Sequence, residues 1–161
     1  AGEAEHNGDI AKAIEIYEEL YALNSNSLVV ANNLASLITS YRDDDESLQR
    51  AFGIARRLRG TEVAPFQDTY GWIAHRMGNY EEALGYLEPA ANALVDDPVA
   101  QYHLAENYVT LQRNPEALAR FQKVVELVQQ AGGPRPPYLD KVEAEISRLS
   151  AAPKQGEADN N

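Results

Sequence analysis

Cysteine is absent from this chain of 161 residues. Its absence excludes disulfides, thiolate chemistry and cysteine-ligated zinc, but it leaves periplasm and cytoplasm equally open as compartments for a soluble protein. Positive charge is scarce, since 14 Lys and Arg face 25 Asp and Glu, for a net charge of −11. A phosphate backbone would repel such a chain, so we expect no nucleic-acid partner. No apolar run approaches the roughly 20 residues of a transmembrane helix, so we expect no membrane span.

The common catalytic motifs are also missing. The sequence contains no GxGxxG, GxxxxGK[ST], GxSxG or HExxH, so nucleotide, acyl-transfer and zinc-hydrolase chemistry have no recognisable residues. Carboxylate pairs among 25 acids are expected by chance and do not indicate acid–base catalysis. We therefore expect a protein that is not an enzyme and carries no cofactor.

What the sequence does contain is an internal repeat. Hydrophobic residues make up 44% of the chain, enough to bury a core. A small residue followed by large apolar residues at helical spacing recurs about every 34 residues, a period typical of stacked helix pairs. The four small anchors are Ala13, Ala51, Ala83 and Ala117.

A first helix is predicted before each of the last three anchors, over residues 29–41, 65–77 and 98–111. Each has apolar residues three and four apart, which places them on one face. Each face also carries a small residue (Ala35, Gly71 or Ala105), which predicts a close crossing of small residue against small residue with the second helix.

Turn and cap residues support this division. Pro65 and Pro98 fit the first turn of a helix, and Gly8 and Gly78 fit tight turns between paired helices. The acidic segment 43–46 is interpreted as a solvated loop with a helix cap, not as a calcium site, because no EF-hand spacing follows. The predicted boundaries are a truncated first repeat at 1–27, repeats at 28–63, 64–97 and 98–130, a capping helix within 131–150 and a disordered tail at 151–161.

These residues resemble the tetratricopeptide repeat. The segment 78–84, Gly-Asn-Tyr-Glu-Glu-Ala-Leu, is similar to the family's turn and second helix, and 7–10, Asn-Gly-Asp-Ile, matches the same turn. Arg42 and Gln112 replace the usual turn glycine. The resemblance covers roughly residues 1 to 130 and implies an all-α fold: a right-handed superhelix of stacked antiparallel helix pairs, here with a C-terminal capping helix.

A narrower resemblance rests on three short strings at 32–35, 68–72 and 102–104. They are similar to repeat proteins associated with bacterial exopolysaccharide and PEP-CTERM systems. In the repeat register, Ala1 falls at the small-residue position of a first helix. The register therefore predicts that this chain is a piece of a longer bacterial repeat protein.

In tetratricopeptide proteins the first helices line a concave groove, so the resemblance implies a non-catalytic scaffold that binds a protein or peptide partner there. Trp72 and Tyr102 are the predicted binding hot spots, although packing between repeats would explain Trp72 equally well. Asn33 matches one position of the family's carboxylate clamp, but the other clamp positions lack the required Lys or Arg. The groove positions are Asn32, Asn33, Ser36, Asp68, Thr69, Trp72, His75, Arg76, Tyr102, His103 and Glu106.

Two other functions remain open from the sequence. His75, His103 and Glu106 are of suitable type to ligate zinc, although polarity of a groove explains them as well. The second is self-association into a homo-oligomer, either through a helix left exposed at the N-terminus or through a cluster of basic residues. If these basic residues do not bind another copy, they form a solvated face that balances the acids of 43–46. These basic residues are Arg50, Arg56, Arg57 and Arg59.

Overall fold

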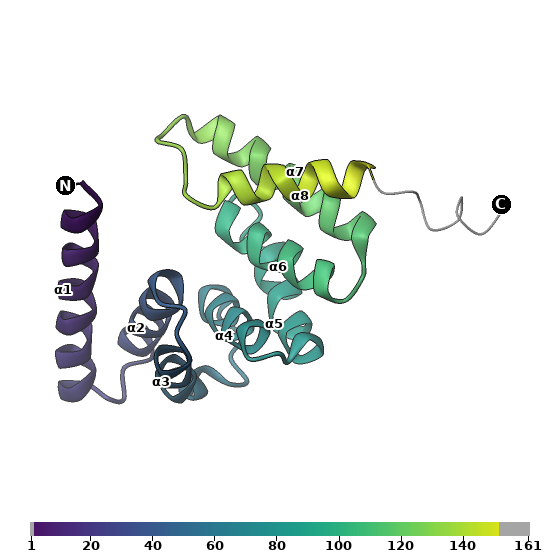
Figure 1. The fold of residues 1–161 in the computed structure, drawn as a ribbon. Coiled ribbons are helices and arrows are strands. Elements are labelled where there is room, and N and C mark those ends of the chain that lie inside the picture. The colour runs from purple at the N-terminus through teal and green to yellow at the C-terminus, as the bar shows by residue number, and fades with distance from the viewer. Residues whose placement is uncertain (1, 152–161) are drawn as a thin grey trace. The chain divides into compact units, whose positions relative to one another are not determined.

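The computed structural model describes residues 2–151, with side chains described from residue 8 onward. Every regular element in this part of the chain is helical, which confirms the predicted all-α class (Figure 1). The elements are α1 (Gly2–Leu23), α2 (Leu28–Tyr41), α3 (Asp45–Ala55), the 3-10 turn η1 (Arg56–Leu58), α4 (Ala64–Arg76), α5 (Tyr80–Ala93), α6 (Pro98–Thr110), α7 (Asn114–Ala131) and α8 (Leu139–Ala151).

Polar caps and prolines fix where several helices begin. The side chains of Ser27, Asp44 and Asp97 accept hydrogen bonds from backbone N–H groups in the first turns of α2, α3 and α6. These bonds satisfy donors that have no partner within the helix. The bond from the Ser47 N–H also lowers the pKa of the Asp44 carboxyl, so the expected cap in the acidic segment is present. Pro65 and Pro98 lie in first turns, as predicted.

Two helix pairs are joined by the same left-handed turn. Gly78 has φ 86°, and the N–H of Asn79 donates to the carbonyl of Ala74 over 2.9 Å. Gln112 has φ 60°, and the N–H of Arg113 donates to the carbonyl of Tyr108 over 2.9 Å. This is the Schellman geometry, in which a left-handed residue closes the helix C-terminus. Gln112 therefore does adopt the conformation that glycine usually supplies.

The predicted turns at Gly8 and Arg42 differ from this pattern. Gly8 lies inside the continuous helix α1 and is absent from the residues with positive φ, so the expected turn there is wrong. The described segment before Gly8 is too short to form a returning helix, and continuing α1 keeps its backbone hydrogen-bonded. Arg42 is extended, with φ −128°, and Asp44, two residues later, caps α3 with its side chain.

The chain divides into two compact units, with the boundary between residues 90 and 91. In the first unit, Leu34, Ile54, Leu58 and Ile73 are completely or almost completely buried among α2, α3, η1 and α4. Residues Ile14, Tyr17 and Tyr21 of α1 pack against this core.

In the second unit, α7 packs against both α6 and α8. Its core contains Leu104 of α6, Phe121 and Val124 of α7, and Val142 of α8. The predicted helix at the C-terminal side is therefore present, and it ends at Ala151. The remainder of the predicted tail, 152–161, lies outside the described residues.

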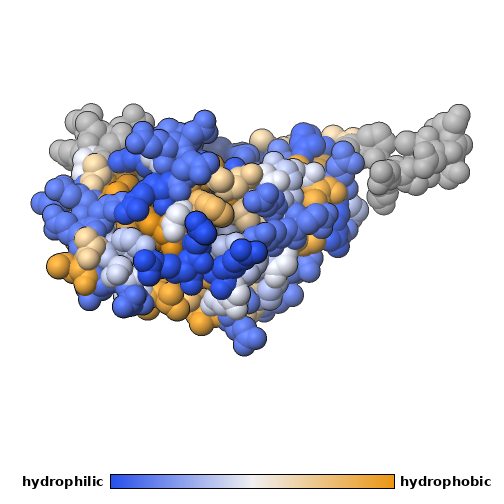
Figure 2. Space-filling model, turned by 90° about the horizontal axis from the view of Figure 1, so that it is seen from below, coloured by the Kyte–Doolittle hydropathy of each residue, from blue (hydrophilic) through white to orange (hydrophobic). Residues whose placement is uncertain are grey.

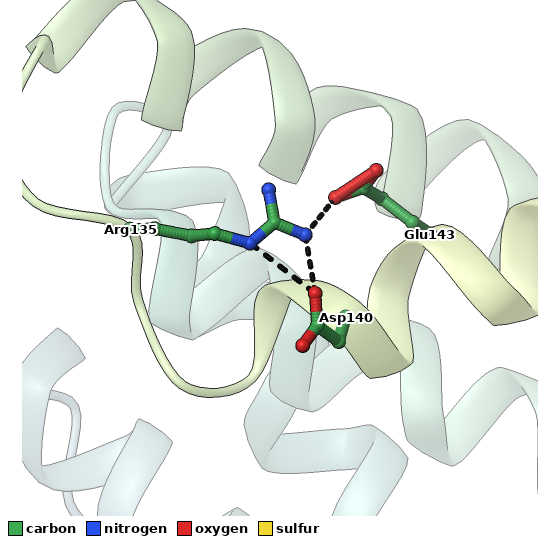
Figure 3. A network of polar contacts seen from close by, with 3 residues as sticks. All are labelled: Arg135, Asp140 and Glu143. Atoms are coloured by element: carbon green, nitrogen blue, oxygen red, sulfur yellow. Dashed lines mark hydrogen bonds and ion pairs between the residues drawn. The ribbon is translucent and has the colours of Figure 1, made fainter.

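The loop before α8 is fastened to that helix by an arginine. The Arg135 guanidinium donates to the carboxylates of Asp140 and Glu143, both in the first half of α8 (Figure 3). The groups are exposed, so the free energy gained is small. Their geometry nevertheless orients the proline-containing connection between α7 and α8.

Gly71 allows α4 and α5 to approach closely, and the atoms nearest to it on α5 belong to large residues. A Cβ added to Gly71 would lie 2.8 Å from Cγ of Leu87 and 3.1 Å from Cβ of Tyr86. The predicted partner, Ala83, is not among the atoms nearest to that point. The absent side chain thus makes room for a large apolar residue, because Leu87 is fully buried there.

Candidate functional site

The predicted groove residues lie on the first helices of three pairs. Those of α2 and α4 belong to the first unit, and those of α6 belong to the second. Each unit is therefore described by itself.

On α2, the polar candidates border a pocket. Asn33 and Ser36 line a recess of about 320 Å³ together with Leu37, Ser40 and Tyr41 of α2 and Tyr17 of α1. Asn32 donates a hydrogen bond from Nδ2 to Oδ1 of Asn33 over 3.3 Å. Its own Oδ1 is buried and has no hydrogen-bond partner among the described residues. The arrangement offers polar groups beside an apolar wall, which is typical of a binding recess.

The remaining wall residues of this pocket were not predicted. Leu37, Ser40 and Tyr41 follow Asn33 and Ser36 within two helical turns on the same helix, and Tyr17 comes from the preceding repeat. Helical spacing alone could have indicated the three residues of α2. The contribution of Tyr17 depends on how α1 packs against α2.

On α4, an aromatic stack is half-buried. The rings of Trp72 and His75 are parallel within 7°, with centroids 4.8 Å apart, and Tyr80 approaches His75 edge-on at 5.3 Å. Because Trp72 and His75 are one turn apart on the same helix, their rings can stack face to face, and the contact fixes the orientation of both rings. Trp72 is only partly buried. Its stacking on His75 of the same helix covers part of its surface.

Three other α4 candidates have different environments. Thr69 is only 7% exposed and donates its hydroxyl to the carbonyl of Pro65, so it supplies packing and not contact surface. Arg76 donates to the carbonyl of Thr39 over 3.0 Å, which ties α4 to the end of α2. Asp68 lies on the same helix and has polar interactions of its own.

On α6, predicted groove residues contact α8 and the loop that precedes it. Tyr102 stacks on Tyr138 with centroids 5.1 Å apart, and Glu106 forms an ion pair with Lys141 at 3.1 Å. Burial raises the pKa of the Glu106 carboxyl, and Lys141 opposes that shift. Burial likewise raises the pKa of the Tyr102 phenol. His103 lies beside Tyr102 at 5.9 Å between ring centroids. These side chains help to hold α8 and its preceding loop.

A buried polar network next to this site was not predicted. Gln101 is fully buried, and its amide nitrogen Nε2 donates to the carbonyls of Ala91 and Leu94. Its Oε1 accepts from Arg120 of α7 over 2.7 Å. Because both ends of its amide group are satisfied, Gln101 stabilises the start of α6. A single glutamine in an amphipathic helix gives no sequence signal of such a role.

The arrangement of the described side chains does not support the alternative of a zinc site. No group of three or more His, Asp or Glu in that part of the chain is arranged to hold a metal ion. Glu106, one of the three candidate ligands, is instead paired with Lys141. Likewise, no helix within the described range is both long and apolar enough to cross a membrane.

Two residues of the basic cluster contact α1. Arg50 forms a bidentate pair with Glu18, with distances of 2.7 and 3.2 Å, and Arg57 donates to the hydroxyl of Tyr21 over 2.8 Å. Both guanidinium groups also approach the face of the Tyr21 ring. Packing therefore brings these two arginines against a distant helix, and the balancing of the acidic loop by the cluster stays a prediction.

Solved structures share this fold. The thermophilic TPR protein TTC0263 of Thermus thermophilus superposes with a TM-score of 0.63 at 23% identity, over 91% of this chain and 76% of that one. MamA gives 0.61 at 15% identity, over 92% and 75%. YrrB, described as a TPR protein with an unusual peptide-binding site, gives 0.59 at 17% identity, over 91% and 71%. The chain therefore has the fold of tetratricopeptide repeat proteins.

The likeness to these proteins lies in the fold alone. No protein-family model matches the sequence, and no curated protein sequence matches it either. The narrower resemblance to exopolysaccharide and PEP-CTERM repeat proteins stays a prediction that rests on its three strings.

Proposed function

We propose that this chain is a non-catalytic protein-interaction scaffold that binds a peptide or helix of a partner protein through the first-helix face of α2 and α4. One observation carries the proposal: the parallel stack of Trp72 on His75, half-buried on α4. A rigid aromatic surface of this kind gains much contact area for little loss of conformational entropy on binding.

The polar surroundings of the stack suit a peptide ligand. Asn33 and Ser36 line the recess on α2, the helix against which α4 packs. Their side chains offer donors and acceptors to a peptide backbone, while Trp72 offers an apolar anchor. YrrB, which shares the fold, is described as having a peptide-binding site, which agrees with this use of the fold.

The predicted groove residues of α6 are a secondary part of the proposed binding surface. Tyr102, His103 and Glu106 occupy equivalent first-helix positions, but Tyr102 and Glu106 already contact Tyr138 and Lys141. A partner that used them would compete with those two contacts. The first unit is therefore the proposed primary binding surface.

The test is a selection of random peptides displayed on phage against the whole chain. Peptides that bind the natural chain are then measured with Trp72→Ala and, as the matched control, Val95→Ala, which removes an exposed apolar side chain in a loop. We expect Trp72→Ala to weaken binding at least about 30-fold, the equivalent of about 2 kcal/mol, while Val95→Ala has no effect. Binding that quenches or shifts the fluorescence of Trp72, the single tryptophan, would place the peptide on this face.

Two results would contradict the proposal. One is a set of selected peptides that bind Trp72→Ala and the natural chain equally well. The other is a selection that enriches no peptide at all from a diverse library. Circular dichroism of each variant shows whether a loss of binding comes from the changed surface or from a loss of helix.

A further inference from the structure

The basic cluster is a local excess of positive charge on an acidic protein. Its members, all of them exposed, lie in α3, in η1 and directly after η1: Arg50, Arg56, Arg57 and Arg59. The stretch 47–61 that contains them has no Asp or Glu, although the chain has 25 of these acids and a net charge of −11. On the face drawn in Figure 2, the most hydrophilic residues likewise gather in one area instead of being spread evenly.

Tyr21 of α1 holds two of these arginines in place. The guanidinium carbon of Arg57 lies 5.3 Å from the centre of the Tyr21 ring, and that of Arg50 lies 5.6 Å from it. Arg57 also donates from Nε to the Tyr21 hydroxyl, and Arg50 is fixed further by its bidentate pair with Glu18. Side chains that are held in this way lose less conformational entropy when they bind a ligand.

Most of the charge of the basic cluster is not neutralised within the protein. Arg50 is paired with Glu18, but among the described residues Arg56, Arg57 and Arg59 form no ion pair. The bond to Tyr21 occupies Nε of Arg57 and leaves both terminal nitrogens without a hydrogen-bond partner in that part of the chain. Those two nitrogens form the edge of a guanidinium group that binds a carboxylate through two parallel hydrogen bonds.

The surface of α3 between these arginines is open. Gly53 lies three residues after Arg50 and four before Arg57, a spacing that places it on their side of the helix. It is exposed, and a Cβ added to it would meet nothing of the surrounding structure within 4 Å. A peptide backbone can therefore approach α3 closely between the two guanidinium groups.

The size and the borders of the basic cluster select its ligand. Residues 50–59 span about 15 Å along a helix, which an extended peptide covers with about four or five residues. Exposed acids lie before the cluster at 44–46 and after it at Glu62, and they would repel a long nucleic acid or a broad anionic membrane. A second copy of this chain would bring a net charge of −11, which opposes its approach. A short acidic segment fits the cluster without these repulsions.

We propose that the basic cluster is a docking surface for a short, extended acidic segment of a partner protein, whose carboxylates pair with Arg56, Arg57 and Arg59. The surface lies on the second helix of the pair α2–α3 and does not include Trp72. It therefore does not depend on the function proposed above, and Trp72→Ala should leave binding of the acidic segment unchanged.

The probe is a fluorescent peptide with a run of aspartates between glycines, compared with the same peptide in which asparagines replace the aspartates. We expect the aspartate peptide to bind the whole chain saturably, with an affinity that falls as salt is added, and the asparagine peptide not to bind. The double variant Arg56→Gln and Arg57→Gln should weaken binding about tenfold or more. The matched control, Arg135→Gln with Arg148→Gln, removes the same charge from exposed arginines of the second unit and should bind as the natural chain does.

Four results would overturn the proposal. The first is that the aspartate peptide does not bind the natural chain, and the second is an equal loss in both double variants, which would trace binding to net charge alone. The third is tighter binding to vesicles of phosphatidylglycerol than to the peptide, lost in the variant of Arg56 and Arg57, because the ligand would then be a lipid surface. The fourth is dimerisation of the natural chain that disappears in that variant, because the ligand would then be a second copy. Circular dichroism establishes that each variant keeps its helices.

Discussion

Gln112 is, within the described chain, the one residue other than glycine with a positive φ. It occupies the place that Gly78 occupies in the preceding pair, with the same closing hydrogen bonds. For a residue with a Cβ this left-handed conformation costs about 1 kcal/mol, a cost that glycine avoids. The sequence already indicated that Gln112 replaces a turn glycine, and the structure shows that the backbone conformation does not change with the substitution.

Gln112→Gly should therefore raise the free energy of unfolding by about 0.5 to 1 kcal/mol. The matched change is Gly78→Ala, which should lower it by about 1 kcal/mol or more, because it introduces a Cβ at φ 86°. Urea unfolding followed by circular dichroism measures both. A loss of stability in Gln112→Gly would mean that the glutamine side chain contributes a contact larger than the strain.

Tyr70 shows how burial changes the chemistry of a single group. Its hydroxyl donates to Oε1 of Glu82 over 2.7 Å, and burial together with this carboxylate raises the pKa of Tyr70 to about 12, from 10.0. Between these two values only the unfolded chain releases the proton. Stability is therefore fully present below pH 10 and falls as the pH rises toward 12.

The corresponding test compares the natural chain with Tyr70→Phe on both sides of pH 10. We expect the natural chain to lose more stability than the variant as the pH rises, because the phenylalanine has no proton to lose. The other tyrosines titrate in both proteins, so the difference between the two curves isolates Tyr70. Parallel curves would show that Tyr70 ionises as easily in the folded chain as in the unfolded one.

At the scale of the helix, the effect of a glycine on helix packing depends on which side chain of the neighbouring helix lies opposite it. Gly71 of α4 faces Leu87 and Tyr86 of α5, whereas Gly85 of α5 has nothing within 4 Å of its Cβ position. Both glycines lie inside helices, so they form a natural pair for comparison.

Gly71→Ala should lower the free energy of unfolding by about 1 to 3 kcal/mol, because the added methyl group overlaps the Leu87 side chain. Gly85→Ala should raise it by up to about 1 kcal/mol through helix propensity alone. Thermal and urea unfolding measure the change in the free energy of unfolding for each of the two variants. If both substitutions stabilise the chain, Leu87 must shift away without loss, and the packing of this pair is looser than the contact distances indicate.

Helix α1 illustrates how an element depends on its neighbours. The residues Asn7-Gly8-Asp9-Ile10 match the family's turn, yet the structure is helical through all of them. A glycine is a weak local signal for a turn, because glycine in a helix costs only about 1 kcal/mol. At Gly78, which lies between the paired helices α4 and α5, the same signal produces the turn.

At the scale of the whole molecule, charge is the dominant property. The net charge is −11, and in the ion pairs of Arg50 with Glu18 and Arg148 with Glu145 the arginine side chains are 50% and 53% exposed. Exposed pairs contribute little to stability, whereas a large net charge repels itself in the compact state.

Moderate salt should therefore raise the melting temperature at neutral pH, because it screens the repulsion among acids more than it weakens the few ion pairs. Scanning calorimetry over a series of sodium chloride concentrations measures the effect. A melting temperature that falls with added salt would show that the ion pairs contribute more to stability than the net charge removes.

The sequence by itself determined the helical class, the ranges of the first helices, the proline starts, a cap within the acidic segment 43–46 and the replacement of a turn glycine by Gln112. Each of these depends on residues within one or two helical turns, where spacing and backbone preference act directly. The tertiary structure alone decided that Arg50 reaches Glu18, that Tyr138 and Lys141 contact the α6 candidates, and that Leu20 is exposed while Val124 is buried. These features depend on which distant helix packs against which face, and that is a property of the assembled chain, not of local spacing.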